Sequence, residues 1–303
     1  MVTSTAPQRS IGRSLSDTTF DVVNYFVLSL ALLAVLYPLY FIIIASFSSP
    51  EAVNAGRVWL WPQEMTDEGY RRIIRDQNIW IGYRNSIIYT VLGTAVNMAL
   101  TIPGAYALSR KDFLGRGVFT MFIAFTMFFQ GGLIPRYLLV RSLGILDTTW
   151  AMILPNAVMV WNVVITRTFF QSTLPDELYE AAAMDGCSNS RFFVQIVLPL
   201  STSVLAVMVL FYGVFHWNSF FDALMFLRSR NRMPLQIILR DILISAQVQA
   251  AMAADAETVA EQQRIAELVK YGVIIVASAP VLALYPFLQK YFVKGVMIGA
   301  IKG

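Results

Sequence analysis

The sequence predicts an all-α integral membrane protein with six transmembrane helices. Of its 303 residues, 57% are hydrophobic and only 14% are charged, and the mean hydropathy is +0.60. A soluble domain usually carries about 25% charged residues. The apolar residues are also clustered into runs of roughly 20, which is long enough to cross a bilayer as helices. A helix satisfies its backbone polar groups internally, as the membrane interior requires.

Six apolar runs are the expected crossings, at about residues 22–45, 85–108, 118–129, 150–166, 201–221 and 271–288. The third run is short, but it can be lengthened through Gly131 and Leu133. Pro103 and Gly104 interrupt the second run, because a proline within a span kinks the helix. Six crossings place both termini on the same side of the membrane.

The distribution of Lys and Arg gives a weak orientation. Basic residues after the second run and in the tail favour the cytoplasmic side for those segments (Arg110, Lys111, Arg116, Lys290, Lys294 and Lys302). The long loops on the opposite side, 47–84 and 227–270, also hold arginines (Arg71, Arg72, Arg75, Arg84, Arg228, Arg230 and Arg232). Long loops follow the rule less strictly, so we expect both termini inside.

Several classes of protein are disfavoured. The middles of the six runs hold no Asp, Glu, Lys or Arg, which weighs against a proton- or sodium-coupled transporter without excluding it. His216 is the one histidine and Cys187 the one cysteine, so we expect no metal site, no internal disulfide and no catalytic residues. The sequence has no GxxxxGK[ST] motif and no basic run typical of nucleic-acid binding. We therefore expect no cofactor on this chain.

The stretch between the fourth and fifth runs, QSTLPDELYEAAAMDGCSNSRFFVQIVLPLS, predicts a short helix with defined ends. Thr173 can cap it, and Pro175 suits the first turn. Asp176 and Glu177 complement the helix dipole, and Gly186 suits a left-handed stop.

The composition of this helix favours docking into a protein groove. Leu178, Ala181, Ala182 and Asp185 share one face by their spacing. Three consecutive alanines make the helix thin, which permits close approach to another surface. An amphipathic helix lying on the membrane is the alternative, but the apolar side chains are small and few.

The same stretch resembles a known family. Glu180-Ala181-Ala182, three residues, Gly186, nine residues, Ile196, one residue and Leu198-Pro199 form a pattern similar to the EAA loop of permease subunits of binding-protein-dependent ABC importers. RNSIIYTVLGTAVNM, AYALSRKDFLGRG and YPFLQKYFVKGVMIGAIKG resemble the carbohydrate branch. HWNSFFDALMFLR and GGLIPRYLL resemble a subgroup associated with complex or oligomeric saccharides. Ser203 departs from the family, which often has proline there.

The resemblance implies an ABC importer type I transmembrane domain over residues 22–289, with its coupling loop at 172–199. Cytoplasmic tails would occupy 1–21 and 290–303. It implies that one group of residues docks on a separate ATPase subunit (Glu180, Ala181, Ala182, Asp185 and Gly186). It implies a second group that forms a hinge into the fifth crossing (Ile196, Leu198 and Pro199).

The resemblance also implies the partners. They are a second permease in a heterodimer, a pair of ATP-binding subunits that use ATP and Mg²⁺, an extracytoplasmic solute-binding protein and a sugar. The chain would be a multi-pass, non-enzymatic subunit of a sugar importer in a prokaryotic inner membrane. An ion-coupled secondary transporter, an ABC permease for another solute and a membrane enzyme remain alternatives.

Candidate substrate residues are polar or aromatic. The main cluster is His216, Trp217, Asn218 and Asp222, and Asn156 and Gln130 are weaker candidates. Such groups recognise sugars, but Trp217 could instead belong to an interfacial aromatic belt. The polar side chains could equally satisfy backbone groups.

Overall fold

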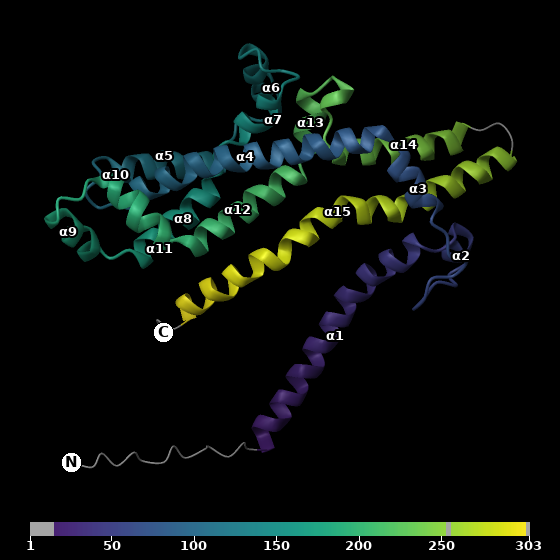
Figure 1. Cartoon of the computed structure of the whole chain (residues 1–303), viewed down its shortest axis with the longest axis horizontal. Helices are drawn as coiled ribbons and strands as arrows, with labels where there is room; N and C mark the ends of the chain where they lie inside the picture. The colour runs from purple at the N-terminus through teal and green to yellow at the C-terminus, as the bar shows by residue number, and fades with distance from the viewer. Residues whose placement is uncertain (1–14, 253–255, 301–303) are drawn as a thin grey trace.

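The computed structural model describes residues 15–252 and 256–300, and these contain helices and connecting segments but no strand (Figure 1). The predicted all-α fold is therefore confirmed for this part of the chain. Most of the predicted N-terminal tail and the last three residues lie outside the described residues.

Within the described residues, seven helices of more than ten residues form the body of the molecule together with the ten-residue α6 (Leu133–Ser142). They are α1 (Leu15–Ser46), α4 (Gln77–Ser109), α5 (Arg116–Phe128), α8 (Val160–Thr173), α12 (Thr202–Trp217), α14 (Leu235–Met252) and α15 (Ala256–Ala300).

Short helices connect them. They are α2 (Pro50–Asn54), α3 (Glu68–Arg75), α7 (Thr149–Ile153), η1 (Leu154–Asn156), α9 (Asp176–Met184), α10 (Asn189–Phe192), the π-helix η2 (Phe193–Val197), α11 (Leu198–Leu200), α13 (Phe221–Phe226) and η3 (Arg230–Arg232).

In the part of the chain that the structure describes, three segments are long and apolar enough to cross a membrane: Ser16–Ser46, Gln77–Ser109 and Gln263–Ala283. They correspond to the first, second and sixth predicted runs. Pro103 does not interrupt the second, because α4 continues through it. The other candidates are bent helix pairs. α5 and α6 meet at 115°, Thr149–Asn156 and α8 at 52°, and Asn189–Leu200 and α12 at 81°.

The third and fifth predicted runs end earlier in the structure than expected. The third does not continue through Gly131 and Leu133, because Gly132 has a φ of +83° and the chain turns sharply into α6. The fifth ends at Trp217 rather than at residue 221, and the segment 218–220 separates it from α13. Both differences come from breaks that hydropathy alone does not register.

Helix α4 is at the centre of the packing. It lies against α8, α12 and α14, and Figure 1 shows it extending along most of the molecule. One core joins it to α8 and α12 around Phe170, Met208 and Tyr212. The buried Tyr212 hydroxyl bonds the Thr101 hydroxyl at 2.6 Å. A second core around Leu235 joins α4 to α14 and α15.

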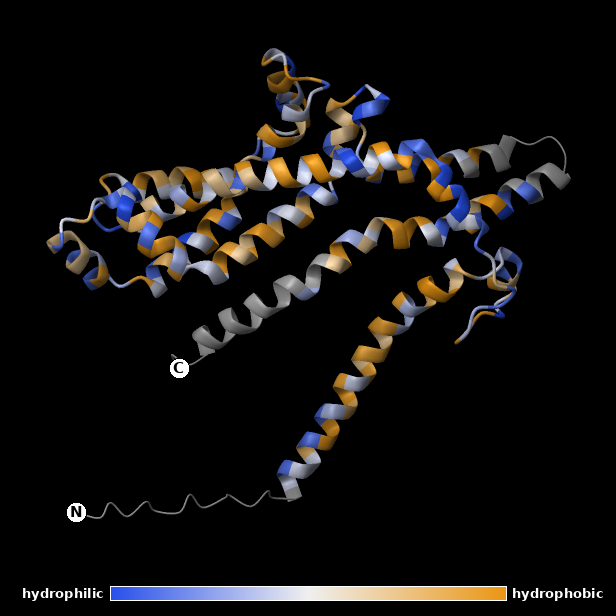
Figure 2. Cartoon of the chain, viewed as in Figure 1, coloured by the Kyte–Doolittle hydropathy of each residue, from blue (hydrophilic) through white to orange (hydrophobic). Residues whose placement is uncertain are grey.

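Helix α1 is apolar over most of its length and is almost entirely exposed (Figure 2). Only 6% of the residues in its apolar window are buried within the chain. It packs on α15 near one end and diverges from the bundle toward the other (Figure 1). Such a surface requires lipid or another protein chain around it.

A close helix contact joins α4 to α12. A Cβ atom built on Gly93 would lie 2.4 Å from His216 Nε2, so only glycine fits at this position without a shift of the imidazole. His216 is 1% exposed and bonds Asn97 through the same nitrogen.

We therefore expect Gly93→Ala to destabilise the protein by about 1–3 kcal/mol, because the methyl group overpacks against His216. Gly104→Ala is the matched control, since this α4 glycine has no atom within 4 Å of its built Cβ. Alanine there should be neutral or stabilising by up to about 1 kcal/mol. Thermal unfolding of both variants in one detergent measures the difference, and equal unfolding temperatures would contradict the prediction.

Candidate functional site

The predicted short helix is α9, at the left end of the molecule in Figure 1. Gly186 follows it with a φ of +74°, which confirms the predicted left-handed stop. The N–H groups of Gly186 and Cys187 donate to the carbonyls of Ala183 and Ala182, each at 3.0 Å, as in a Schellman motif. At the other end the capping prediction is wrong, because Thr173 is the last residue of α8 and Pro175 occupies the cap position.

Two sides of α9 have different surroundings. Leu178 and Ala182 are partly buried against the core of α4, α8 and α12. Glu180, Ala181 and Asp185 are exposed, as is Gly186. The predicted single face is therefore divided between an inward and an outward side. The docking role of these residues stays a prediction.

The predicted hinge residues lie where the chain bends into α12. Ile196 belongs to the π-helix η2, and Leu198 and Pro199 belong to α11. Ile196 and Leu198 pack against the core, whereas Pro199 is exposed. The 81° bend falls at Ser201, directly after α11. Their role in movement is also a prediction.

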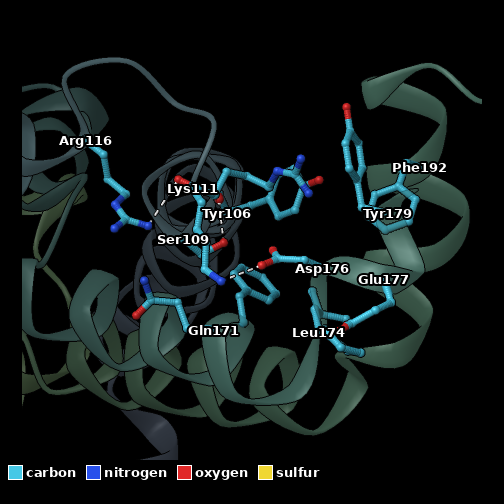
Figure 3. Close-up of a pocket in the computed structure, with 13 residues that line it drawn as sticks. Tyr106, Ser109, Lys111, Arg116, Gln171, Leu174, Asp176, Glu177, Tyr179 and Phe192 are labelled. Carbon is cyan, nitrogen blue, oxygen red and sulfur yellow. Dashed lines mark hydrogen bonds and ion pairs between the residues drawn. The ribbon is translucent and has the colours of Figure 1, made fainter. Parts of the chain in front are cut away.

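A cavity of about 400 Å³ separates α9 from the end of α4 (Figure 3). Lys111 Nζ crosses it to Asp176 at 2.6 Å. This hydrogen bond and the charge of Asp176 raise the pKa of Lys111. The Arg110 guanidinium lies 3.5 Å from the centre of the Tyr179 ring. These two contacts connect α9 to the segment that follows α4.

A second polar group lies where three segments meet: α6, η1 and α13. Arg136 Nη1 and Nη2 lie 3.0 and 3.1 Å from the two carboxylate oxygens of Asp222. Arg136 Nη2 also donates to Asn156 Oδ1 at 3.0 Å, and Asn156 Nδ2 donates to Asp222 Oδ2 at 2.5 Å. We call Arg136, Asn156 and Asp222 the polar triad. Each member contacts the other two.

The polar triad is connected to the core of the bundle through Asn97. Its amide nitrogen donates to the carbonyls of Asn156 and Ala157 at 2.6 and 2.9 Å, where η1 breaks from α8. Asn97 Oδ1 lies 2.6 Å from His216 Nε2. The oxygen can only accept, so this contact requires the proton of the imidazole on Nε2.

The structure divides the predicted substrate residues. Asn156 and Asp222 meet directly, and His216 joins them through Asn97. Trp217 is buried in the second core and donates to the Ala277 carbonyl at 3.0 Å. Asn218 is exposed and bonds the Val214 carbonyl of its own helix, while Gln130 is exposed between α5 and α6.

Arg136 was not among the predicted site residues. The stretch GGLIPRYLL could have indicated it, because two glycines precede a charged residue within an apolar stretch. Gly132 indeed begins the turn that carries α6 to Asp222. The pairing could not be predicted from the sequence, because the two residues are 86 positions apart.

The loop after α13 is fixed near the polar triad by Asp147. Its carboxylate accepts hydrogen bonds from the backbone N–H groups of Arg228 and Ser229, each at 3.0 Å, and from the Ser229 hydroxyl. Partial burial raises the pKa of Asp147, but these hydrogen bonds outweigh it and lower the pKa to about 2. The Tyr89 hydroxyl secures the same loop by donating to the Arg232 carbonyl at 2.7 Å.

Comparison with known proteins identifies the class. The family described as "Binding-protein-dependent transport system inner membrane component" matches residues 79–298. This range is more than half of the chain, so the chain belongs to that family of membrane permeases. The resemblance seen in the EAA pattern is confirmed at this level.

Individual relatives are similar over nearly their whole length. The "Polygalacturonan/rhamnogalacturonan transport system permease protein YtcP" of Bacillus subtilis is 40% identical, over 95% of this chain and 100% of the relative. The "Arabinooligosaccharides transport system permease protein AraQ" of Halalkalibacterium halodurans is 28% identical, over 88% and 91%. A solved structure, "Crystal structure of a bacterial ABC transporter involved in the import of the acidic polysaccharide alginate", is 34% identical with a TM-score of 0.81, over 93% and 100%.

The lowered pKa of Asp147 predicts that the stability of the folded protein depends on pH. Its pKa is about 2 when folded and about 3.9 in an unfolded chain, so its stabilisation is complete above pH 4 and is lost as the pH falls toward 2. Asp147→Asn should remove most of that pH dependence and cost about 1 kcal/mol at neutral pH. Thermal unfolding between pH 2 and 7 measures both effects. A parallel loss in the variant and the native protein below pH 4 would contradict the assignment.

Proposed function

We propose that this chain is one of two transmembrane subunits of an ATP-driven oligosaccharide importer. The observation that carries the proposal is α9, an exposed short helix with the EAA pattern, stopped by Gly186 and anchored to the bundle by its inner side. Family membership supports the class, and the names of the relatives support a saccharide cargo.

In the proposed topology, the three straight helices and three bent pairs give six crossings, with both termini in the cytoplasm of a prokaryote. α9 then faces the cytoplasm. The basic segment after α4, with Arg110, Lys111 and Arg116, falls on the same side, in agreement with the positive-inside rule. The coupling loop lies between the fourth and fifth crossings.

The proposed coupling runs from α9 into α4. A separate pair of ATPase subunits binds ATP with Mg²⁺, closes and moves α9, while this chain itself holds no cofactor. The Lys111–Asp176 ion pair and the Arg110–Tyr179 contact transmit that movement to the end of α4. The bend at Ser201 permits α12 to follow. Transport has direction because the cargo binds the two resulting states differently.

The remaining partners cover surfaces that this chain leaves open. A second, related permease would complete the translocation path, which would run past the polar triad. An extracytoplasmic binding protein would deliver the saccharide. Lipid or the second permease would surround α1, whose apolar side chains are exposed.

An ion-coupled secondary transporter is the second candidate. The Arg136–Asp222 pair favours it, since Arg136 lies in the bent pair α5–α6 and ionisable groups in membrane-spanning segments often mark ion paths. In that case uptake would collapse with an uncoupler and persist without any ATPase subunit.

We expect Gly186→Pro to abolish ATP-dependent uptake and to weaken co-purification of the ATPase at least tenfold. Proline cannot adopt the left-handed φ and removes the N–H that closes α9. Glu180→Lys should weaken docking in the same way through the reversed charge.

Gly56→Pro is the matched control. Gly56 has a φ of +67°, and its N–H likewise donates to a backbone carbonyl, that of Val53, but it follows α2 at the other end of the molecule. Normal co-purification of the ATPase with Gly186→Pro, together with normal ATPase stimulation, would refute the role of α9.

A further inference from the structure

We propose that Arg136 receives the carboxylate of an acidic oligosaccharide, so that this chain itself selects uronate-bearing cargo. The proposal rests on the importer function above and deepens it. It is carried by the geometry of the polar triad, by the arginines around it and by their place relative to the two ends of α4.

The polar triad is built at broken helices. α6 begins after Gly132, and η1 is separated from α8 by residues 157–159. In membrane transporters, discontinuous helices commonly form substrate sites, and ionisable residues within spanning segments are costly unless they function. The side chain of Arg136 is 32% exposed, whereas that of Asp222 is 9% exposed. The arginine is therefore the accessible charge, and the aspartate is its support.

Arg136 retains donors for a ligand. Its two Nη2 protons go to Asn156 and Asp222, and Nη1 faces the second oxygen of Asp222. The contacts found among the described residues leave the Nε–H and one Nη1–H open. A guanidinium held in this way is pre-oriented for a carboxylate, which binds it with strong charge-assisted hydrogen bonds.

The surroundings are positively charged. The segments 133–160 and 218–234 contain five arginines and two aspartates (Arg136, Arg141, Arg228, Arg230, Arg232, Asp147 and Asp222), and no lysine or glutamate. Apart from Arg136, all these arginines are exposed. The carboxylate of Asp147 accepts hydrogen bonds from the backbone of the loop, and the carboxylate of Asp222 pairs with Arg136. The net positive field attracts an anionic solute toward the triad.

These arginines lie on the side of the membrane where the charge rule disfavours them. Asn85 and Tyr89, near the start of α4, hold the loop that contains Arg232, whereas Lys111 follows the end of α4 beside α9. The 24 helical steps from Asn85 to Ser109, the end of α4, span about 36 Å, close to the thickness of a bilayer. The positive-inside rule gives no reason for arginines on the outer side. The binding of an anionic saccharide would give them a function there.

Two aromatic side chains lie beside the guanidinium of Arg136. Tyr137 follows Arg136, and its ring stacks with Phe226 at 6.5 Å and 15°. The Arg136 guanidinium lies 5.5 Å from the Phe226 ring, and Arg228 Nη2 reaches the Tyr137 hydroxyl at 3.4 Å. Phe226 is 1% exposed, so its ring supports the guanidinium from within the protein. The partly exposed Tyr137 places a hydroxyl beside Arg136 that a saccharide can use.

The test uses the complete importer in proteoliposomes, with trigalacturonate and its methyl ester as probes. The native importer should take up the acid at least tenfold faster, since a charge-assisted hydrogen bond contributes about that factor. The variant R136Q/D222N keeps the triad neutral but removes the guanidinium. It should bring the ratio of the two rates close to one, whatever the absolute rate at which the variant takes up the ester.

R240Q/D241N is the matched control, because it removes a similar ion pair from the exposed surface of α14. It should preserve the native ratio. Arg230→Gln removes one exposed positive charge and changes no member of the polar triad. It therefore tests the attraction of the anionic probe by the surrounding arginines even if R136Q/D222N does not fold. It should lower the ratio about twofold, and 0.5 M salt should lower the native ratio by screening.

Two results would overturn the proposal. One is a native importer that transports both probes equally, and the other is a ratio unchanged in both R136Q/D222N and Arg230→Gln. ATP-dependent uptake of the ester without discrimination would remove the carboxylate site and leave the importer function intact. A complete importer with no ATP-dependent uptake of either probe or of a neutral arabino-oligosaccharide would refute the proposed function itself.

Discussion

The structure depends on the hydrogen bonds that α4 supplies to the backbone of broken neighbours. Asn97 donates to the two carbonyls freed between η1 and α8, and Asn85 donates to the carbonyls of Asn231 and Met233 before α14. Ser86 Oγ accepts the N–H of Leu235 at 2.9 Å. A polar group left unsatisfied in hydrocarbon costs several kcal/mol. One continuous helix with a polar buried side therefore makes its discontinuous neighbours possible.

The same helix joins the two regions to which functions are proposed. Asn97 lies twelve residues, about 18 Å of helix, before the end of α4 at Ser109, and Lys111 follows that end. In the proposed mechanism, a displacement of α9 therefore acts on the helix that also caps the break beside the polar triad. The buried contact of Gly93 with His216 fixes α12 to this helix. The coupling and cargo selection proposed above require no long chain of mobile side chains, because α4 alone contacts both proposed regions.

Features encoded locally could be predicted from the sequence. The three straight apolar helices follow from long runs of apolar residues, and the end of α9 follows from Gly186, since only neighbouring residues set its backbone angle. Features set by distant partners could not. The separation of Trp217 from His216 depends on α15 packing against one side of α12 and α4 against another. Arg136 and Asp222 avoid the cost of isolated charges only because α6 and α13 meet, and no local pattern encodes that meeting.

The π-helix η2 has a consequence for the chain that connects α9 to α12. A π-turn accommodates one more residue than an α-turn, so η2 stores a single surplus residue between Phe193 and Val197. Loss of that surplus would restore ordinary winding and rotate α9 by about 100° about the local axis, since each α-helical residue advances by that angle. The direction that the exposed side of α9 with Glu180 faces therefore depends on the number of residues between Phe193 and Val197. A deletion in this segment changes that direction, whereas a substitution leaves the number of residues unchanged.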